Sequence, residues 1–145
     1  MRTLVLASQK GGVGKTTIAG HLAVMAESAG AGPVALIDTD PQGSLSSWWN
    51  ERKAETPVFA SVDIVQLADH LQQLKKAGIK LAIIDTPPAV TETIRQVLAV
   101  ADLVLIPTRP SPHDLRAVGS TVALVEAVGK RMVFVINGAA QRAKI

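Results

Sequence analysis

A glycine-rich segment, QKGGVGKTT, occupies residues 9–17 of this 145-residue chain. It follows the apolar run TLVLAS (Thr3–Ser8), which predicts a buried strand, and it opens a stretch with apolar residues at helical spacing over residues 15–29. A glycine-rich turn between a strand and a helix points successive backbone N–H groups inward at the positive end of the helix dipole. The segment therefore predicts a nest for an anion such as phosphate.

Each residue type in this loop is predicted to make a different contact with the ligand. Gly11, Gly12 and Gly14 allow the backbone to curl around the anion. Lys15 would bring a point charge to the β- and γ-phosphates of a nucleotide, and the Thr16 hydroxyl would ligate Mg²⁺. A glycine-rich turn without any ligand is the alternative, and the flanking strand, the helix and the GKTT ending argue against it.

Two positions depart from the general phosphate-binding pattern. Gln9 stands five residues before Gly14, where that pattern has glycine, and a second lysine, Lys10, follows it. A phosphate-binding loop needs only one lysine. Lys10 is therefore either a solvated loop residue or a residue with a separate role.

Strand and helix patterns alternate along the rest of the chain. Further apolar strands are predicted at Val34–Asp38, Lys80–Asp85, Leu103–Pro107 and Arg131–Asn137, with helical patterns between them. The composition is 48% hydrophobic but only 3% aromatic, so aliphatic side chains must fill the core. These patterns predict one α/β domain over residues 1–145, with a mostly parallel sheet and helices on both faces. No helix is expected after the last strand, which suggests a C-terminally truncated fold with one uncovered strand face.

Acidic residues end two of the predicted strands, where a parallel sheet binds its ligands. Asp85 follows four apolar residues and is suited to hold Mg²⁺ through water. Asp38 and Asp40 are two residues apart on extended chain and point the same way. Three carboxylates at one site need cations nearby, which Mg²⁺, Lys15 and Lys10 would supply.

Composition excludes several other classes of site. The chain has no cysteine, which rules out disulfides, thiolate metal sites and iron–sulfur clusters. No apolar run is long enough to span a bilayer, no signal-peptide pattern is present, and no terminal amphipathic helix is expected to attach the chain to a membrane. A net charge of +3 is weak evidence for a nucleic-acid partner. The basic residues at the end of the chain fit a solvated tail or a DNA-contacting patch; they are Lys130, Arg131, Arg142 and Lys144.

Four motifs in order give the chain a resemblance to a known family. KGGVGKTT resembles the deviant Walker A motif of the ParA/MinD group of P-loop ATPases, DTDPQGS its second motif, and IIDTPP its Walker B motif. LVLIPTRPSPHDLRAVGS resembles the segment after the fifth strand of ParA-type partition ATPases. The likeness extends from Thr3 to Asn137 and implies the doubly wound P-loop NTPase fold.

The resemblance also implies roles for individual residues. Lys10 would be the signature lysine that crosses a dimer interface to phosphate on the other subunit, whereas Lys15 acts within its own subunit. Asp40 would orient the attacking water, and Asp38 and Asp85 would position Mg²⁺ together with Thr16. The remaining nucleotide contacts implied by the family are the loop residues Gly11, Gly12, Val13 and Gly14, Thr17 at the α-phosphate, Asn137 at adenine and Pro107 near the base.

At the level of function, the resemblance implies a cytoplasmic ATPase that binds Mg·ATP and forms a homodimer in that state. Nonspecific DNA binding and an adaptor of the ParB kind that stimulates slow hydrolysis belong to the same expectation. Two alternatives remain: a noncatalytic nucleotide-binding remnant that acts as a regulator, and a P-loop kinase or synthetase for a small molecule.

Two adjacent tryptophans, Trp48 and Trp49, follow the second motif. Neighbouring residues do not share a helix face, so one is expected to pack and the other to be more exposed. Packing beneath a loop and contact with a partner are both compatible with the sequence.

Overall fold

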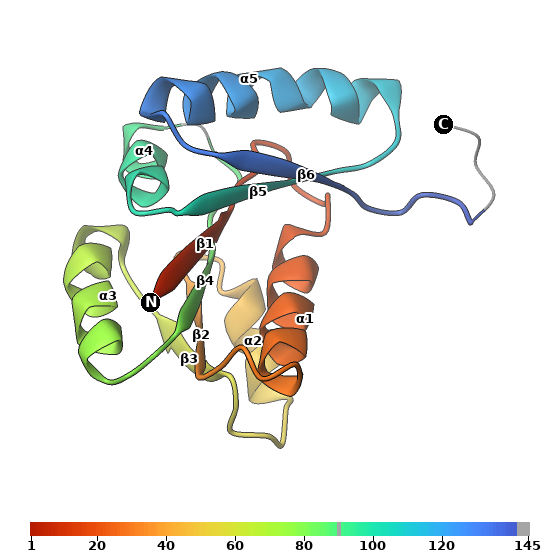
Figure 1. Cartoon of the computed structure of the whole chain (residues 1–145). Coiled ribbons are helices and arrows are strands. Elements are labelled where there is room, and N and C mark those ends of the chain that lie inside the picture. The colour runs from red at the N-terminus through yellow and green to blue at the C-terminus, as the bar shows by residue number, and fades with distance from the viewer. Residues whose placement is uncertain (90, 142–145) are drawn as a thin grey trace.

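The computed structural model describes residues 1–89 and 91–141, in which strands and helices alternate (Figure 1). The strands are β1 (Arg2–Leu6), β2 (Val34–Asp38), β3 (Val58–Ser61), β4 (Leu81–Asp85), β5 (Leu103–Thr108) and β6 (Met132–Ile136). The helices are α1 (Lys15–Ser28), α2 (Ser44–Asn50), α3 (Leu67–Lys76), α4 (Glu92–Ala99) and α5 (Pro112–Val128), and a 3₁₀ turn, η1 (Ile64–Gln66), precedes α3. The described strands pair in parallel in the order β3-β2-β4-β1-β5-β6. The predicted fold class is confirmed.

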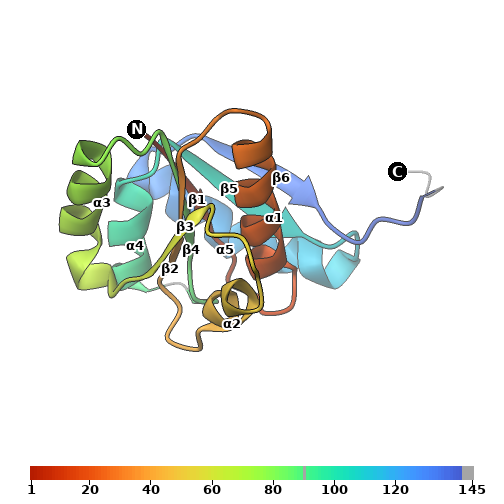
Figure 2. The same ribbon diagram turned by 90° about the horizontal axis from the view of Figure 1, so that it is seen from below.

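Helices cover both faces of the sheet (Figure 2). On one face α3, α4 and α5 pack against the strands, where Leu71, Val97 and Val125 are buried with alternate strand residues. On the other face α1 and α2 bury Ala19, Ala23 and Leu45 against the intervening strand residues. Alternation of strand side chains between two apolar layers explains why the strands read as continuous hydrophobic runs.

The parallel register brings the ends of three strands to one edge. Asp38 at the end of β2 is in register with Asp85 at the end of β4, and Asp85 is in register with Leu6 at the end of β1. The loop from β1 to α1 leaves the sheet at this same edge. The fold therefore gathers the predicted loop and carboxylates, as ligand sites of such sheets require.

The strand β3 is not expected from the sequence. It has only four residues, follows Pro57, and lies at the edge of the sheet, where Val58 and Ser61 are exposed. An edge strand with two exposed residues lacks the apolar run that marks the buried strands. β3 matters to the site because its end adjoins that of β2, with Asp38 in register with Ser61.

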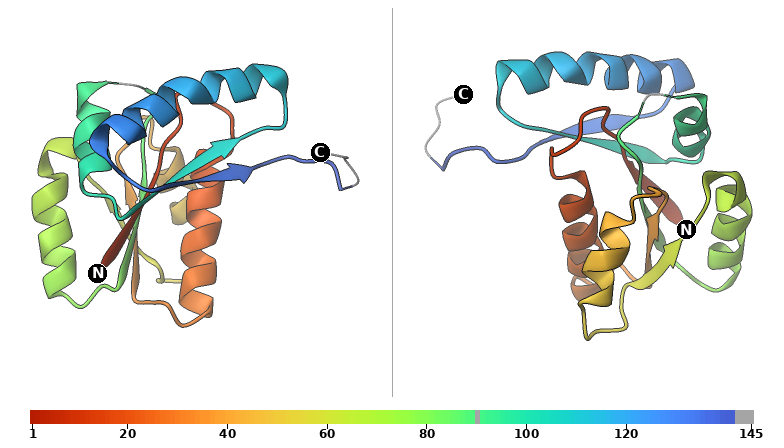
Figure 3. Two further views of the ribbon diagram at one scale, coloured as in Figure 1. Left: turned by 45° about the horizontal axis from the view of Figure 1, so that its top comes forward. Right: turned by 180° about the vertical axis from the view of Figure 1, so that it is seen from behind.

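The last strand, β6, lies at the opposite edge and pairs with β5. Val133, Phe134 and Ile136 are 41%, 52% and 47% exposed. Because side chains alternate along a strand, Val133 lies on one face of β6 and Phe134 and Ile136 on the other, so exposed side chains lie on both faces. Figure 3 shows α5 over one face of β5 and β6. Arg142 and Lys144 of the predicted basic patch lie outside the described residues. Among the helices that the structure describes, none has the length and hydropathy needed to cross a membrane.

Candidate functional site

The glycine-rich loop leads into α1 with an open helix terminus. Gly14 is the N-cap in the left-handed region at φ +88°, and no side chain caps the first turn of α1. Gly12 has φ +76°, so two residues of the loop need the backbone freedom of glycine. The uncapped N–H groups at the start of the helix are available to a ligand, as an anion nest requires.

Gly14 has a further constraint, because Asn137 lies directly against it. A Cβ built on Gly14 would overlap Asn137 Nδ2 and lie 3.3 Å from Asn137 Cγ. We expect Gly14→Ala to destabilise the fold by about 1–3 kcal/mol and to weaken nucleotide binding, because alanine is strained at positive φ and meets Asn137. Gly11→Ala is the matched control, since a Cβ there meets nothing within 4 Å. Chemical denaturation of both variants tests this, and equal stabilities would contradict it.

Lys15 is held at the end of β4. Its Nζ lies 3.0 Å from Asp85 Oδ1 and donates to the backbone carbonyl of Thr86, and its side chain is only 7% exposed. Thr86 is not among the residues expected from the sequence, because its contribution is a backbone oxygen. Lys15 therefore places a nearly buried cation, paired with Asp85, at the mouth of the anion nest.

Thr16 and Asp85 offer oxygen ligands side by side. The Thr16 hydroxyl donates to Asp85 Oδ2 at 2.7 Å, and Asp85 is buried. Mg²⁺ prefers oxygen ligands at 2.0–2.1 Å in an octahedron, which places neighbouring ligand oxygens about 3 Å apart. The hydroxyl and the carboxylate are donors of the type that would suit such an ion, bound directly or through water.

Asp38 is buried beneath the loop that follows β2. Its carboxylate accepts a hydrogen bond from the backbone N–H of Asp40 at 2.9 Å and weaker ones from the N–H and hydroxyl of Ser46. Burial raises the pKa of Asp38 above its ordinary value, and the nearby carboxylate of Asp85 adds to the rise, whereas the bonds from Asp40 and Ser46 oppose it. The surroundings of Asp38 thus disfavour its charged form.

The raised pKa of Asp38 predicts that the free energy of unfolding depends on pH. The charged form of Asp38 is disfavoured in the fold, so stability is lost as pH rises from the ordinary pKa through the raised one. We expect Asp38→Asn to stabilise the protein at pH 7 and to leave stability near pH 3 unchanged. Denaturant titrations of both proteins across this range measure the difference, and an Asp38→Asn protein that is less stable at pH 7 would contradict it.

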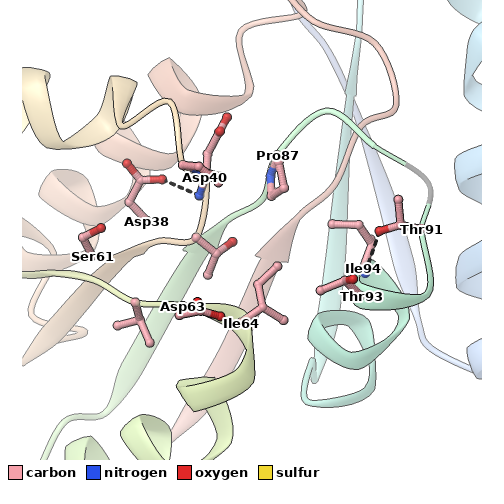
Figure 4. A pocket seen from close by; sticks show the side chains of 12 residues that line it. Asp38, Asp40, Ser61, Asp63, Ile64, Pro87, Thr91, Thr93 and Ile94 are labelled. Carbon is pink, nitrogen blue, oxygen red and sulfur yellow. Dashed lines mark hydrogen bonds between the residues drawn. The ribbon is translucent and has the colours of Figure 1, made fainter.

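Asp40 is less buried than Asp38. Its carboxylate accepts from the backbone N–H of Gln42 at 2.9 Å, and Figure 4 shows that it does not point toward the carboxylate of Asp38. Asp40 lines two cavities, one over the glycine-rich loop and one on the side of β3. It therefore stands at the boundary between the predicted phosphate site and a neighbouring hollow.

Lys10 has a partner that the sequence does not reveal. Its Nζ forms an ion pair with Asp114 in the first turn of α5, and its side chain is 35% exposed. The hydrogen bond from Lys10 lowers the pKa of Asp114 below its ordinary value, and that from the Ser111 hydroxyl adds to the effect. The spacing of Ser111 and Asp114 predicts a helix cap, which the structure confirms, but no local pattern predicts a contact with a loop about a hundred residues away.

The loop residues border a cavity of about 540 Å³. Its lining joins the loop to the segments after β2 and β4, and consists of residues 10–17 together with Asp40, Gln42, Ser44, Trp48 and Pro88. Most of the residues expected to hold a nucleotide are thus brought together. Gln42, Ser44, Trp48 and Pro88 are additional.

Two of the expected nucleotide contacts lie beside this cavity. Asn137 Nδ2 donates to the backbone carbonyl of Val13 at 3.0 Å, and Pro107 is buried in β5. Neither is among the described residues that line the cavity. Asn137 therefore ties the segment after β6 to the glycine-rich loop.

The two tryptophans lie in different environments, but the expectation that one of them is more exposed is not met. Trp49 stacks on Phe59 at a ring distance of 5.4 Å and donates from Nε1 to the carbonyl of Pro57. Trp48 lies against Gly20 of α1, where a Cβ would be 3.0 Å from its ring, and it lines the cavity. Both tryptophans are partly buried, so neither is freely exposed.

Comparison with known proteins places these features in context. Residues 4–142 match the family described as the CobQ/CobB/MinD/ParA nucleotide binding domain. The maintenance of carboxysome distribution protein A of Halothiobacillus neapolitanus is 38% identical over 138 residues, which cover 88% of this chain and 60% of that protein. The chromosome-partitioning ATPase Soj of Thermus thermophilus is 30% identical, over 88% of this chain and 63% of that protein. The chain therefore spans less than two thirds of the length of these relatives.

A solved structure supports the same fold. Apo McdA from Cyanothece superposes with a TM-score of 0.77 at 23% sequence identity, over 94% of this chain and 72% of that chain. At this identity the likeness is evidence for the fold.

Proposed function

Because the chain belongs to the CobQ/CobB/MinD/ParA nucleotide-binding family, we propose that it is a ParA-type ATPase whose self-association is switched by Mg·ATP. In this proposal two copies bind face to face around their nucleotides, and hydrolysis separates them. The task would be to position or segregate a large cargo such as a plasmid, a chromosomal region or a protein assembly. The names of its relatives, a carboxysome-distribution protein and a chromosome-partitioning ATPase, support that class of task.

The observation that carries the proposal is the grouping of Lys15, Thr16 and Asp85 beneath an uncapped helix terminus. The ammonium of Lys15 is 3.0 Å from Asp85, and the Thr16 hydroxyl bonds the other oxygen of the same carboxylate. An incoming triphosphate offers Lys15 a second, more highly charged partner. The loop N–H groups and Lys15 would hold the phosphates, while Thr16 and Asp85 would hold Mg²⁺.

The remaining steps follow from the positions of the side chains. Bound Mg²⁺ would neutralise charge on the terminal phosphates. Asp40, at the outer wall of the cavity, would accept a hydrogen bond from water and orient it toward the terminal phosphate. Trp48, Gln42 and Ser44 border the same space on the α2 side.

Lys10 gives the switch its dependence on a second copy. It lies at the rim of the cavity and is tied to Asp114 rather than to the loop itself. In the proposal, Lys10 leaves Asp114 when a second copy presents its triphosphate, and it then contacts that phosphate across the interface. A cation supplied in trans makes assembly depend on the bound nucleotide, as an arginine finger makes catalysis depend on a partner. DNA contact in the assembled state and stimulation by an adaptor of the ParB kind belong to the same proposal.

Phosphate release from ATP, measured with and without Mg²⁺, tests the enzymatic part. We expect slow, Mg²⁺-dependent conversion of ATP to ADP and phosphate without any acceptor molecule. Tight ATP binding without phosphate release would instead favour a noncatalytic regulator. Release only in the presence of a small-molecule acceptor, with a phosphorylated or condensed product, would favour a kinase or a synthetase.

A further inference from the structure

The short helix α2 depends on its side-chain contacts for its position. It has seven residues, its N-cap is Gly43, and no side chain among the described residues caps its first turn. A helix of this length is not stable by itself, so tertiary packing must place it. Figure 3 shows that α2 lies beside α1. Leu45, which is fully buried, is one anchor of α2, and the two tryptophans in its second half are the others.

The two tryptophans anchor α2 to different neighbours. Trp49 stacks on Phe59 of β3, whereas Trp48 packs against Gly20 of α1. The guanidinium group of Arg52 lies over the ring of Trp48, 5.1 Å from the ring centroid. Trp48 is therefore held between α1 and the segment that follows α2.

The contact between Trp48 and Gly20 depends on glycine. Gly20 lies inside α1, where glycine is less favourable than any residue except proline. A Cβ at position 20 would lie 3.0–3.1 Å from three atoms at the far end of the Trp48 indole. The ring thus occupies the space that a side chain at position 20 would need. The pair sets how closely α2 approaches α1.

The loop that carries Asp40 joins β2 to α2 and is fixed at both ends. At its start, the hydroxyl and the N–H of Thr39 donate to the carbonyl of Asp85, at 2.7 and 3.1 Å. At its end, the N–H of Gly43 donates to the carbonyl of Asp40 at 3.0 Å, and the chain then enters α2. Because Asp40 lies between these two anchors, its position depends on where α2 is docked. Asp40 and Trp48 both line the nucleotide cavity.

We propose that Trp48 is a positioning residue, which holds α2 against α1 and thereby holds the Asp40 carboxylate over the nucleotide cavity. The inference deepens the proposed function and rests on it, because Asp40 is the residue proposed to orient water. Lys15 and Thr16 belong to α1 itself and do not depend on the docking of α2. A poor fit of Trp48 should therefore slow hydrolysis much more than it weakens ATP binding.

A double-mutant cycle on Gly20 and Trp48 tests the proposal. Gly20→Ala pushes a methyl group against the indole, and Trp48→Phe removes the far end of the indole, so each change alone spoils the contact. In the double variant the added methyl group meets a shorter ring. Gly119→Ala in α5 is the matched control, because a Cβ there meets nothing within 4 Å in the described part of the chain.

Three measurements are made on each protein. Single-turnover phosphate release and equilibrium ATP binding separate hydrolysis from affinity. Hydrogen exchange of residues 39–47, followed by mass spectrometry of the nucleotide-free protein, reports how firmly the loop and α2 are held. The exchange measurement does not depend on hydrolysis.

We expect each single variant to release phosphate about tenfold more slowly, with ATP affinity within about threefold of native, because a small misplacement of Asp40 affects the reaction more than binding. Exchange over residues 39–47 should be faster in both. The double variant should recover much of the native rate and protection, and Gly119→Ala should match native protein.

Single variants with native phosphate release and native exchange would overturn the proposal. So would a double variant whose losses are the sum of the two single losses, because the two residues would then act independently. Native protein that binds ATP without releasing phosphate would contradict the proposed function instead. In that case the exchange rates of the four variants still show whether Trp48 holds the loop.

Discussion

Replacing Lys15 with glutamine is expected to weaken ATP binding by a factor of about 100 or more. The Lys15 side chain is 7% exposed, so its charge acts in a medium far less polarisable than water. Glutamine retains a hydrogen-bond donor but supplies no charge to the phosphates. A 100-fold loss corresponds to about 2.7 kcal/mol, within the range of one charge-assisted contact to an anion. Titration with a fluorescent ATP analogue measures it.

The same change should destabilise the ligand-free protein. Asp85 is 1% exposed, and Lys15 is the cation that pairs with it. Removal of one partner of a buried ion pair costs about 3–5 kcal/mol. The double variant Lys15→Gln/Asp85→Asn removes both charges and should recover most of the stability without recovering ATP binding. Lys15→Gln protein that binds ATP with native affinity would show that the loop lysine does not hold phosphate.

Asp40→Asn is expected to reduce ATP hydrolysis about 100-fold while it changes ATP affinity by less than about threefold. The carboxylate of Asp40 is proposed to orient water, and asparagine is a much weaker proton acceptor. The loop should keep its shape, because the amide oxygen of asparagine can still accept from the backbone N–H of Gln42. Single-turnover phosphate release, compared with equilibrium ATP binding, separates the two effects.

Asp63→Asn is the control for this second prediction. Asp63 caps η1 and does not border the nucleotide cavity, so basal hydrolysis should remain at the native rate. An Asp40→Asn protein that hydrolyses ATP as fast as native protein would remove Asp40 from the proposed mechanism. A parallel loss of binding and hydrolysis would instead assign Asp40 to nucleotide binding.

The local patterns of the sequence predicted the elements that have strong local signals. The buried strands such as Val34–Asp38 are continuous apolar runs, and α5 has Ser111 as its cap and Pro112 at its start. The strand β3 was missed because a short edge strand buries too little to leave an apolar run. Element order and the parallel arrangement follow from alternation, whereas the presence of an edge strand depends on tertiary packing.

In the candidate site, too, some contacts could be predicted from the sequence and others could not. The positions of Lys15, Thr16 and Asp85 followed from motif spacing and from the common edge reached by parallel strands. The ion pair between Lys10 and Asp114 could not be predicted, because it joins a loop to a helix that is distant in sequence and is set by how α5 packs. The Thr86 carbonyl was missed for a different reason, since a backbone oxygen leaves no signal in residue type.

Lys10 is the residue on which the proposed switch depends most. In the ligand-free protein it is paired with Asp114, so its contact with a second copy must replace that ion pair. Lys10→Ala removes the side chain without touching Lys15, Thr16 or Asp85. Nucleotide binding by a single copy should therefore persist in this variant, whereas association of two copies should weaken.

Light scattering coupled to size-exclusion chromatography, with Mg²⁺ and either ADP or a nonhydrolysable ATP analogue, measures this association directly. We predict that native protein is a monomer with ADP and a dimer with the analogue. Lys10→Ala should remain a monomer with the analogue at the same protein concentration, although it binds that nucleotide. Native protein whose mass does not respond to the nucleotide, or Lys10→Ala protein that dimerises as readily as native protein, would contradict the proposal that two copies share the triphosphate through Lys10.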